Sequence, residues 1–173
     1  ITSDGGDTWT FEPIGEDDFH LHEIAQAADG RLYLAAEAGM AYRSDDGGAT
    51  WVELSSPYEG SFFGVLPLEG DAVLLFGLRG HLFRSADRGE SWQPIETGTE
   101  AMLTHGLHLV DGSLVIVGSE GTLLLSRDDG ASFELRPQSD RQALATVLET
   151  AEGALLRAGE FGVNRLPLDG EER

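Results

Sequence analysis

The sequence contains no cysteine, no lysine and no long hydrophobic run. Without cysteine, the chain has neither a disulfide framework nor thiol chemistry. No uninterrupted apolar run approaches the roughly 18–20 residues that a membrane-spanning helix needs, so direct membrane insertion is not expected. The 11 basic residues, all arginines, face 31 acidic residues, and the formal net charge is −20. Such a surface argues against nucleic-acid or membrane-surface binding and favours a cationic partner, or serves solubility alone.

The chain starts at Ile1 in the middle of a repeated motif, without an initiator methionine or a signal peptide. We therefore expect a piece of a longer protein. Its 173 residues are enough for one domain with a real core.

A short phrase recurs along the chain as TSDGGDTW, SDDGGATW, SADRGESW and SRDDGASF. Its closing aromatic residues are Trp9, Trp51, Trp92 and Phe133, at intervals of 42, 41 and 41. Two further columns keep a spacing of 41: Gly39, Gly80, Gly121 and Gly162, and Gly30, Asp71, Gly112 and Gly153. Self-similarity at a fixed period of this length indicates a repeat architecture.

Each unit predicts four strands. The first is an alternating segment whose apolar residues four positions apart should share one side of the strand. These pairs are Leu21 and Ala25, Phe62 and Leu66, Leu103 and Leu107, and Leu144 and Leu148. A tight turn, a nearly continuous apolar run and a short third strand follow, and the phrase leads into a fourth strand. The fourth strands carry or end at Pro13, Pro57, Pro94 and Pro137, and proline belongs on a sheet edge.

These features predict an all-β fold, a β-propeller of four-stranded antiparallel blades with about four blades' worth of strands. The expected divisions are 1–16 as the outer strand of a preceding or shared blade, blades over 17–58, 59–98 and 99–139, and an incomplete last blade over 140–173. The outer strands at the two ends could complete one blade and close a four-bladed ring. We favour the alternative, part of a larger propeller, for example a seven-bladed one.

The repeated phrase is suited to closing a turn. Its Ser and Asp side chains can bond backbone groups a few residues on, its Gly supplies a positive φ, and its aromatic ring can pack between blades. It lacks the ligand spacing and the terminal Glu of a calcium loop, so we expect neither a metal nor a cofactor. The residues assigned this structural role are Asp4, Gly6, Thr8, Trp9, Ser44, Asp46, Gly48, Thr50, Trp51, Ser85, Asp87, Gly89, Ser91, Trp92, Ser126, Asp128, Gly130, Ser132 and Phe133.

The phrase matches the Asp-box, or BNR repeat, whose pattern is Ser-x-Asp-x-Gly-x-Thr/Ser-Trp/Phe. The second and third copies match fully, the first has Thr2 for Ser, and the fourth ends in Phe133. A decayed fifth copy keeps Asp169 but has Pro167 and Glu171 in place of Ser and Gly. Because sialidases, sortilin-type receptors and many other propellers share the box, it does not define an activity.

The wider repeat, ADGRLYLAAEAGMAYRSDDGGATW, resembles the photosystem II stability and assembly factor family, and most of all its non-photosynthetic bacterial relatives. The resemblance covers essentially the whole chain. It implies an extracytoplasmic, periplasmic propeller, commonly seven-bladed, that acts as an assembly or accessory protein rather than an enzyme. Its partner would be a protein, such as a membrane protein or transporter complex. The photosynthetic members are associated with an Arg-rich patch, and this acidic chain departs from them there.

The candidate partner surface lies on the face opposite the boxes, where a loop offers Tyr58 and Phe63 and a neighbouring turn offers Arg79. Aromatic residues and arginine are the usual anchors of protein interfaces. His22 and His105, on innermost strands, are added to this surface. The alternative interpretation is that Phe63 packs in the core, Tyr58 covers a blade edge and the channel histidines are simply hydrogen-bonded or solvated.

Glycoside hydrolysis is the competing function, because sialidases carry Asp-boxes. It needs two carboxylates about 5–9.5 Å apart across a sugar. A sialidase-type site also needs a tyrosine nucleophile and an arginine cluster, and no arrangement in the sequence singles out catalytic residues. The sequence thus predicts a non-catalytic, protein-binding propeller, with a sialidase-like propeller fragment as the alternative.

Overall fold

The computed structural model describes residues 1–11, 13–15 and 19–166. Fifteen strands in this part of the chain form four antiparallel sheets that follow one another in sequence order, and each sheet is one blade. The first blade comprises β1 (Leu21–Gln26), β2 (Leu32–Ala36), β3 (Ala41–Ser44) and β4 (Val52–Glu53). The second comprises β5 (Phe62–Pro67), β6 (Val73–Gly77), β7 (Leu82–Ser85) and β8 (Gln93–Pro94).

The third blade comprises β9 (Leu103–His108), β10 (Leu114–Gly118), β11 (Leu123–Ser126) and β12 (Glu134–Leu135). The fourth comprises β13 (Leu144–Glu149), β14 (Leu155–Gly159) and β15 (Gly162–Arg165). Two short 3₁₀ turns, η1 (Leu78–Gly80) and η2 (Ser119–Gly121), join the second and third strands of the middle blades. The all-β prediction with four-stranded antiparallel blades is confirmed.

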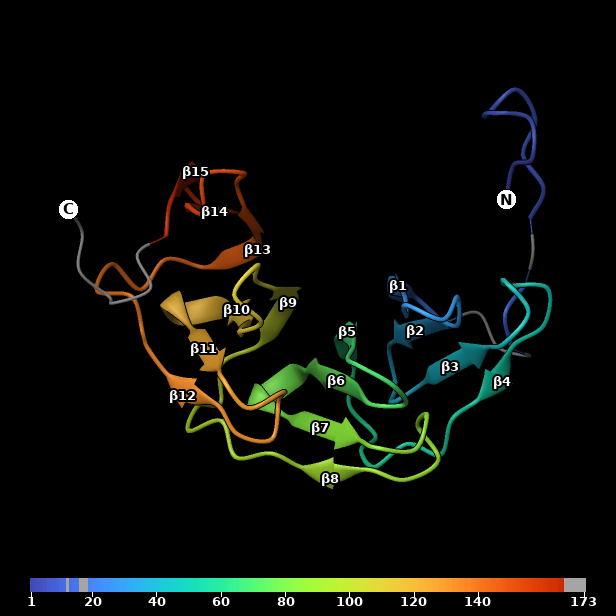
Figure 1. Cartoon of the computed structure of the whole chain (residues 1–173), viewed down its shortest axis with the longest axis horizontal. Coiled ribbons are helices and arrows are strands. Elements are labelled where there is room, and N and C mark those ends of the chain that lie inside the picture. The colour runs from blue at the N-terminus through green and yellow to red at the C-terminus, as the bar shows by residue number, and fades with distance from the viewer. Residues whose placement is uncertain (12, 16–18, 167–173) are drawn as a thin grey trace.

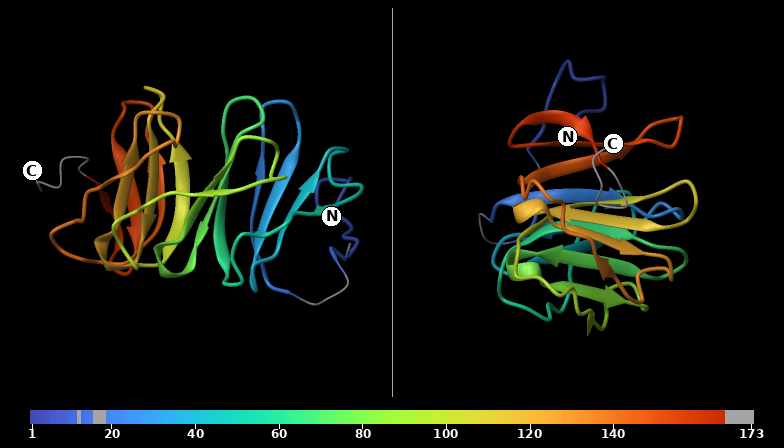
Figure 2. Two further views of the ribbon diagram at one scale, coloured as in Figure 1. Left: turned by 90° about the horizontal axis from the view of Figure 1, so that it is seen from below. Right: turned by 90° about the vertical axis from the view of Figure 1, so that its left-hand side faces the viewer.

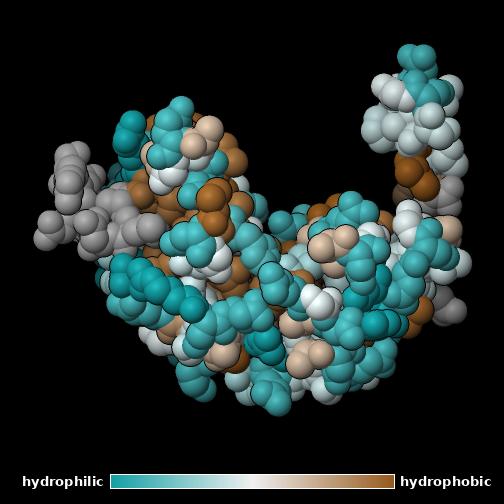
Figure 3. All heavy atoms as spheres, viewed as in Figure 1, coloured by the Kyte–Doolittle hydropathy of each residue, from teal (hydrophilic) through white to brown (hydrophobic). Residues whose placement is uncertain are grey.

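The four blades stand side by side in an open arc, with the N-terminal segment beyond the first blade (Figures 1 and 2). The innermost strands β1, β5, β9 and β13 contact one another in this order along the concave side. Within the described ranges, no helix is both long and apolar enough to cross a membrane. Figure 3 shows that the convex side of the arc is largely hydrophilic, whereas hydrophobic surface gathers over the fourth blade.

The core lies between the blades rather than in one central mass. One cluster joins the first and second blades, including Tyr33, Phe62 and Leu75, and a second joins the next pair. A third cluster, built around Val115 and Leu144, joins the third and fourth blades. The second and third blades therefore bury both faces of their inner strands, which explains why β6 and β10 are nearly continuous apolar runs.

The predicted sidedness of the innermost strands is wrong, because each contains a β-bulge. A bulge adds one residue to the strand and reverses the alternation beyond it. In β5, for example, Phe62 packs toward the first blade together with Val65, three positions on, while Leu66 packs toward the third blade. Spacing by four, as predicted for Phe62 and Leu66, therefore puts the two side chains on opposite sides.

The expected outer strand near the N-terminus is not formed: residues 8–11 and 13 are in no strand. A fourth strand needs the third strand of its own blade to pair with, and no such strand flanks this segment in the described chain. The decayed fifth box at 167–173 lies outside the described residues.

Candidate functional site

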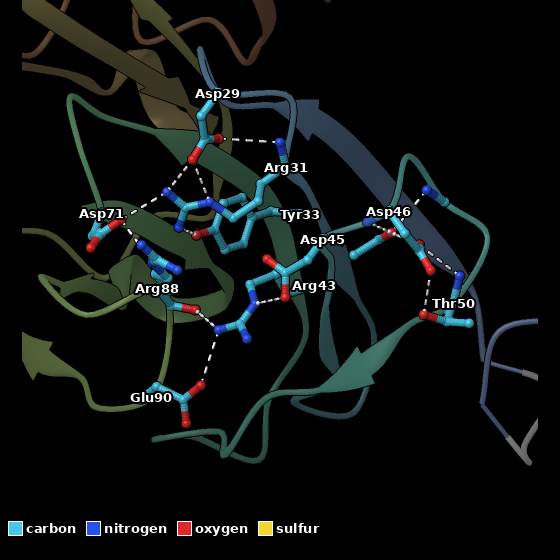
Figure 4. A network of polar contacts seen from close by, with 12 residues as sticks. Asp29, Arg31, Tyr33, Arg43, Asp45, Asp46, Thr50, Asp71, Arg88 and Glu90 are labelled. Carbon is cyan, nitrogen blue, oxygen red and sulfur yellow. Dashed lines mark hydrogen bonds and ion pairs between the residues drawn. The ribbon is translucent and has the colours of Figure 1, made fainter.

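The second Asp-box, residues 44–51, closes on itself through five hydrogen bonds (Figure 4). The Ser44 hydroxyl donates to Asp46 Oδ1 at 2.8 Å and accepts from the Gly48 amide at 2.8 Å. The Asp46 carboxylate also accepts from the Thr50 amide at 2.8 Å and the Thr50 hydroxyl at 2.7 Å. Each of these bonds joins residues that are two or four positions apart, so the box is a local structure.

The other boxes repeat this geometry. Asp87 and Asp128 accept from the amide and hydroxyl of Ser91 and Ser132, and Asp4 accepts from both groups of Thr8. These bonds hold the pKa of Asp46 at about 2, chiefly through the Thr50 hydroxyl and amide, with Ser44 adding to them. The box carboxylates are thus ionised acceptors whose oxygens are occupied by their own loop.

Two arginines tie a blade to the Asp-box of the next blade. Arg43, on β3, donates to the Arg88 carbonyl at 2.9 Å and to Glu90 at 3.0 Å in the third box. Arg84, the equivalent residue on β7, donates to the Asp129 carbonyl at 3.2 Å in the fourth box. We call these contacts of Arg43 and Arg84 the arginine latch. The sequence analysis missed it, although its signal was present: an arginine stands directly before the box serine in two copies that are 41 residues apart.

The opposite face carries an aromatic cluster at the junction of the first and second blades. The ring of Tyr58 lies 4.1 Å from that of His81 and packs over Phe62 and Phe83 at 6.2 and 6.3 Å between ring centroids. Tyr58 is half-buried and His81 is exposed. Tyr58 thus both covers the core, as the alternative interpretation held, and presents an edge to solvent beside His81.

Arg79 lies next to this cluster at the tip of the turn between β6 and β7. Its φ of +57° belongs to the left-handed region, and its side chain is exposed. It forms no ion pair with any residue in the described part of the chain. Beside it, a hollow of about 450 Å³ is lined by this turn and by the loop from Pro94 to Glu100.

The other predicted surface residues lie on the innermost strands. Phe63 is half-buried and its ring is 4.8 Å from that of exposed His22, on the neighbouring strand. The buried core residue is Phe62 rather than Phe63. His105 is on β9, and β5 lies between it and the strand of His22. The structure thus brings Phe63 and His22 together and leaves His105 apart from them.

Polar side chains of the innermost strands bond the backbone of the next strand in the arc. Glu23 accepts from the Val65 amide at 2.8 Å, and His105 Nδ1 accepts from the Val147 amide at 3.4 Å. Burial raises the pKa of Glu23 and lowers that of His105. Glu23 and His105, which lie two periods of 41 apart and so have the same place in the repeat, therefore serve two different blade junctions. Within the described residues, no group of His, Asp or Glu side chains is arranged to hold a metal ion.

The boxes and the arc of four-stranded blades define the class of protein: the chain is a β-propeller region built on Asp-box repeats. The family model for the BNR/Asp-box repeat matches residues 42–53. No curated protein matches the sequence.

Similar solved structures are propellers of low sequence identity. YCF48 bound to D1 peptide superposes with a TM-score of 0.71 at 18% identity over 96% of this chain. YCF48 from Cyanidioschyzon merolae gives a TM-score of 0.66 at 15% identity over 96%. A catalytically inactive virginiamycin B lyase from Staphylococcus aureus, with quinupristin, gives 0.74 at 13% identity over 87%. The chain spans 57%, 60% and 53% of these three chains, respectively. Since a lyase shares the architecture, the likeness establishes the fold alone.

Proposed function

We propose that this chain is part of a non-catalytic β-propeller that binds a protein partner and serves a membrane protein complex outside the cytoplasm as an accessory or assembly factor. The observation that carries the proposal is the surface formed by Tyr58, His81 and Arg79. An exposed arginine without an ion-pair partner in the described chain stands beside a half-buried aromatic cluster, and interface anchors have this character.

Two further observations support a binding role. The box carboxylates accept hydrogen bonds within their own loops, so the boxes stabilise turns. Among similar folds, YCF48 has been captured with a peptide. That likeness motivates protein binding here, while the partner of this acidic chain is to be found by experiment.

The test is a pull-down from detergent-solubilised envelope at low and high salt, analysed by mass spectrometry. The 173-residue chain is compared with the double variant Arg79→Ala/His81→Ala. Arg88→Ala, which removes an exposed arginine on the box face, is the matched control. We expect one membrane protein to be enriched by the wild type and the control, lost with the double variant and reduced at high salt.

Equal enrichment by the double variant would overturn the assigned surface. Cleavage of chromogenic glycosides by the same preparation, with no protein enriched, would replace the proposal by the glycoside hydrolase alternative.

A further inference from the structure

A second hollow lies on the box face, where the turns of the third and fourth blades meet. It measures about 310 Å³, at the lower end of the volumes of ligand pockets. Its lining includes Leu109, Val110 and Asp111 from the third blade and Glu149, Gly153 and Leu155 from the fourth. The hollow is therefore apolar at its base, with two carboxylates on its walls.

The equivalent place between the first and second blades is filled by the chain itself. There, the buried guanidinium of Arg31 donates to Asp29 on its own turn and, at 2.8 Å, to Asp71 on the next blade (Figure 4). The same group donates to the Gly70 carbonyl at 3.2 Å and the Tyr33 hydroxyl at 3.2 Å. The junction of the first and second blades thus shows that this place in the fold accommodates an arginine guanidinium.

The register of the repeat relates the two places residue by residue. Two periods after Asp29 stands Asp111, and two periods after Arg31 stands Ser113. The turn is held in the same way, because the Ser113 amide donates to Asp111 Oδ1 at 2.8 Å as the Arg31 amide donates to Asp29 Oδ1 at 3.2 Å. The position of Asp71 is taken by Gly153, which leaves room. One of the two acceptors, Asp111, is kept, and the arginine of the turn is replaced by Ser113.

The junction of the second and third blades shows that this combination is not a general property of the repeat. Its corresponding positions are Gly70, Ala72 and Gly112, which offer no carboxylate. Ala72 instead belongs to the apolar cluster at that junction, together with Leu68. Of the three junctions, one holds an arginine between carboxylates, one is apolar, and one has carboxylates around a hollow.

The remaining walls suit an arginine side chain. Glu149 Oε2 accepts from the Val110 amide at 2.7 Å, which fixes its carboxylate at the rim. Val110 is 93% exposed, and it offers an apolar surface to the methylene stem of an arginine. The Ser113 amide and side chain, and then the charge of Arg127, lower the pKa of Asp111, so its carboxylate is ionised at neutral pH. A planar guanidinium matches carboxylates better than an ammonium does.

We propose that the hollow between the third and fourth blades binds an arginine side chain of a partner polypeptide, in the manner in which Arg31 binds between the first two. This site lies on the face opposite Arg79 and Tyr58, so it goes beyond the surface assigned above. The excess of carboxylates over arginines in the chain gives it charge complementarity to such a partner.

The test uses a capped peptide, Ala-Arg-Ala, with Ala-Lys-Ala as its control, titrated into the 173-residue chain and followed by amide NMR shifts. We expect the arginine peptide to shift the amides of Val110, Asp111 and Ser113 and to bind at least tenfold more tightly than the lysine peptide. Asp111→Asn should weaken binding about tenfold. Ser113→Arg, which restores the arginine of the first junction, should abolish it, and Arg79→Ala should leave it unchanged.

Equal binding of the two peptides would overturn the proposal, since it would show general attraction to an acidic surface. Unchanged binding by Ser113→Arg, with this variant folded by its amide spectrum, would do the same. The two proposals can fail separately. If the arginine peptide binds but no partner is enriched through Arg79 and His81 in the pull-down, only the proposed function fails, and the opposite result rejects only the arginine site.

Discussion

The first and third Asp-boxes share the hydrogen bonds of their aspartate but have different surroundings. In both, the aspartate accepts from a hydroxyl two residues before it and from the amide and hydroxyl of the residue four positions after it. The third box leads from β7 to β8 within the second blade, whereas the first lies outside every sheet of the described chain. Trp9 is 73% exposed, while Trp92 packs against the core between the first two blades.

The difference separates two tasks that the repeated phrase combines. Its hydrogen bonds span two to four residues and form wherever the phrase occurs, because they need no partner from elsewhere in the chain. Its attachment to the fold depends on long-range contacts, namely the burial of the ring and the arginine latch from the preceding blade. The first box has the hydrogen bonds without this attachment.

The largest expected effect on stability comes from removing the tryptophan ring of the third box. Trp92→Ala should lower the free energy of unfolding by about 3 kcal/mol, near the low end for emptying an aromatic site because the ring is only partly buried. Trp9→Ala should change it by less than about 0.5 kcal/mol, as an exposed substitution does. Urea unfolding of both variants checks this, and equal effects of the two would show that the first box is packed in solution.

A smaller effect is expected from the aspartate. Asp87→Ala removes the acceptor of three bonds inside the third box and should lower the melting temperature by roughly 3–6 °C. Asp4→Ala removes the same set from the first box and should open that loop without moving the melting temperature. Calorimetry gives the melting temperatures, and amide NMR of residues 2–8 reports the local opening. A fall in melting temperature with Asp4→Ala would mean that the first box supports a blade.

The arginine latch should contribute less again. Arg43→Ala loses its bonds to the Arg88 carbonyl and to Glu90, partly screened by water, and should cost about 1 kcal/mol. Arg88→Ala is the matched control, because its exposed ion pair with Asp71 lies within the second blade. If Arg43→Ala and the control were equally mild in urea unfolding, the latch would not attach the box.

Local and repeated features of the fold could be predicted from the sequence. The period of 41, the turn chemistry of the boxes and the blade plan depend on residue types at fixed spacing. The β-bulge of β5 could not be found in this way, since the spacing of four between Phe62 and Leu66 fits a regular strand and only pairing with β6 reveals the extra residue. The missing outer strand near Trp9 likewise depends on a partner strand, not on its own sequence.

The candidate site could be predicted only in part, because it too combines local features with long-range contacts. Tyr58 and Arg79 could be placed on one face from the order of strands and turns. The contact of Tyr58 with His81 depends on side-chain packing between the first two blades. The separation of His105 from His22 follows from the order of the blades, because β5 lies between their strands. The hollow beside Asp111 is visible only when one junction is compared with another, because Arg31 and Ser113 have the same place in the repeat but opposite effects.

The smallest expected effect is on the pH dependence of stability, and it sharpens the comparison furthest. Hydrogen bonds lower the pKa of Asp4 and of Asp87 below the ordinary value of 3.8, through Thr8 in one case and Ser91 in the other. A lowered pKa in the folded state contributes stability that is present above pH 3.8 and is lost as the pH falls toward the folded pKa. Carboxyl NMR should find both values lowered. Only Asp87→Asn should reduce the loss of unfolding free energy at acidic pH. The reason is that closure of the third box is coupled to the blades, whereas closure of the first box is not. The same reduction with Asp4→Asn would contradict this separation of local closure from attachment to the fold.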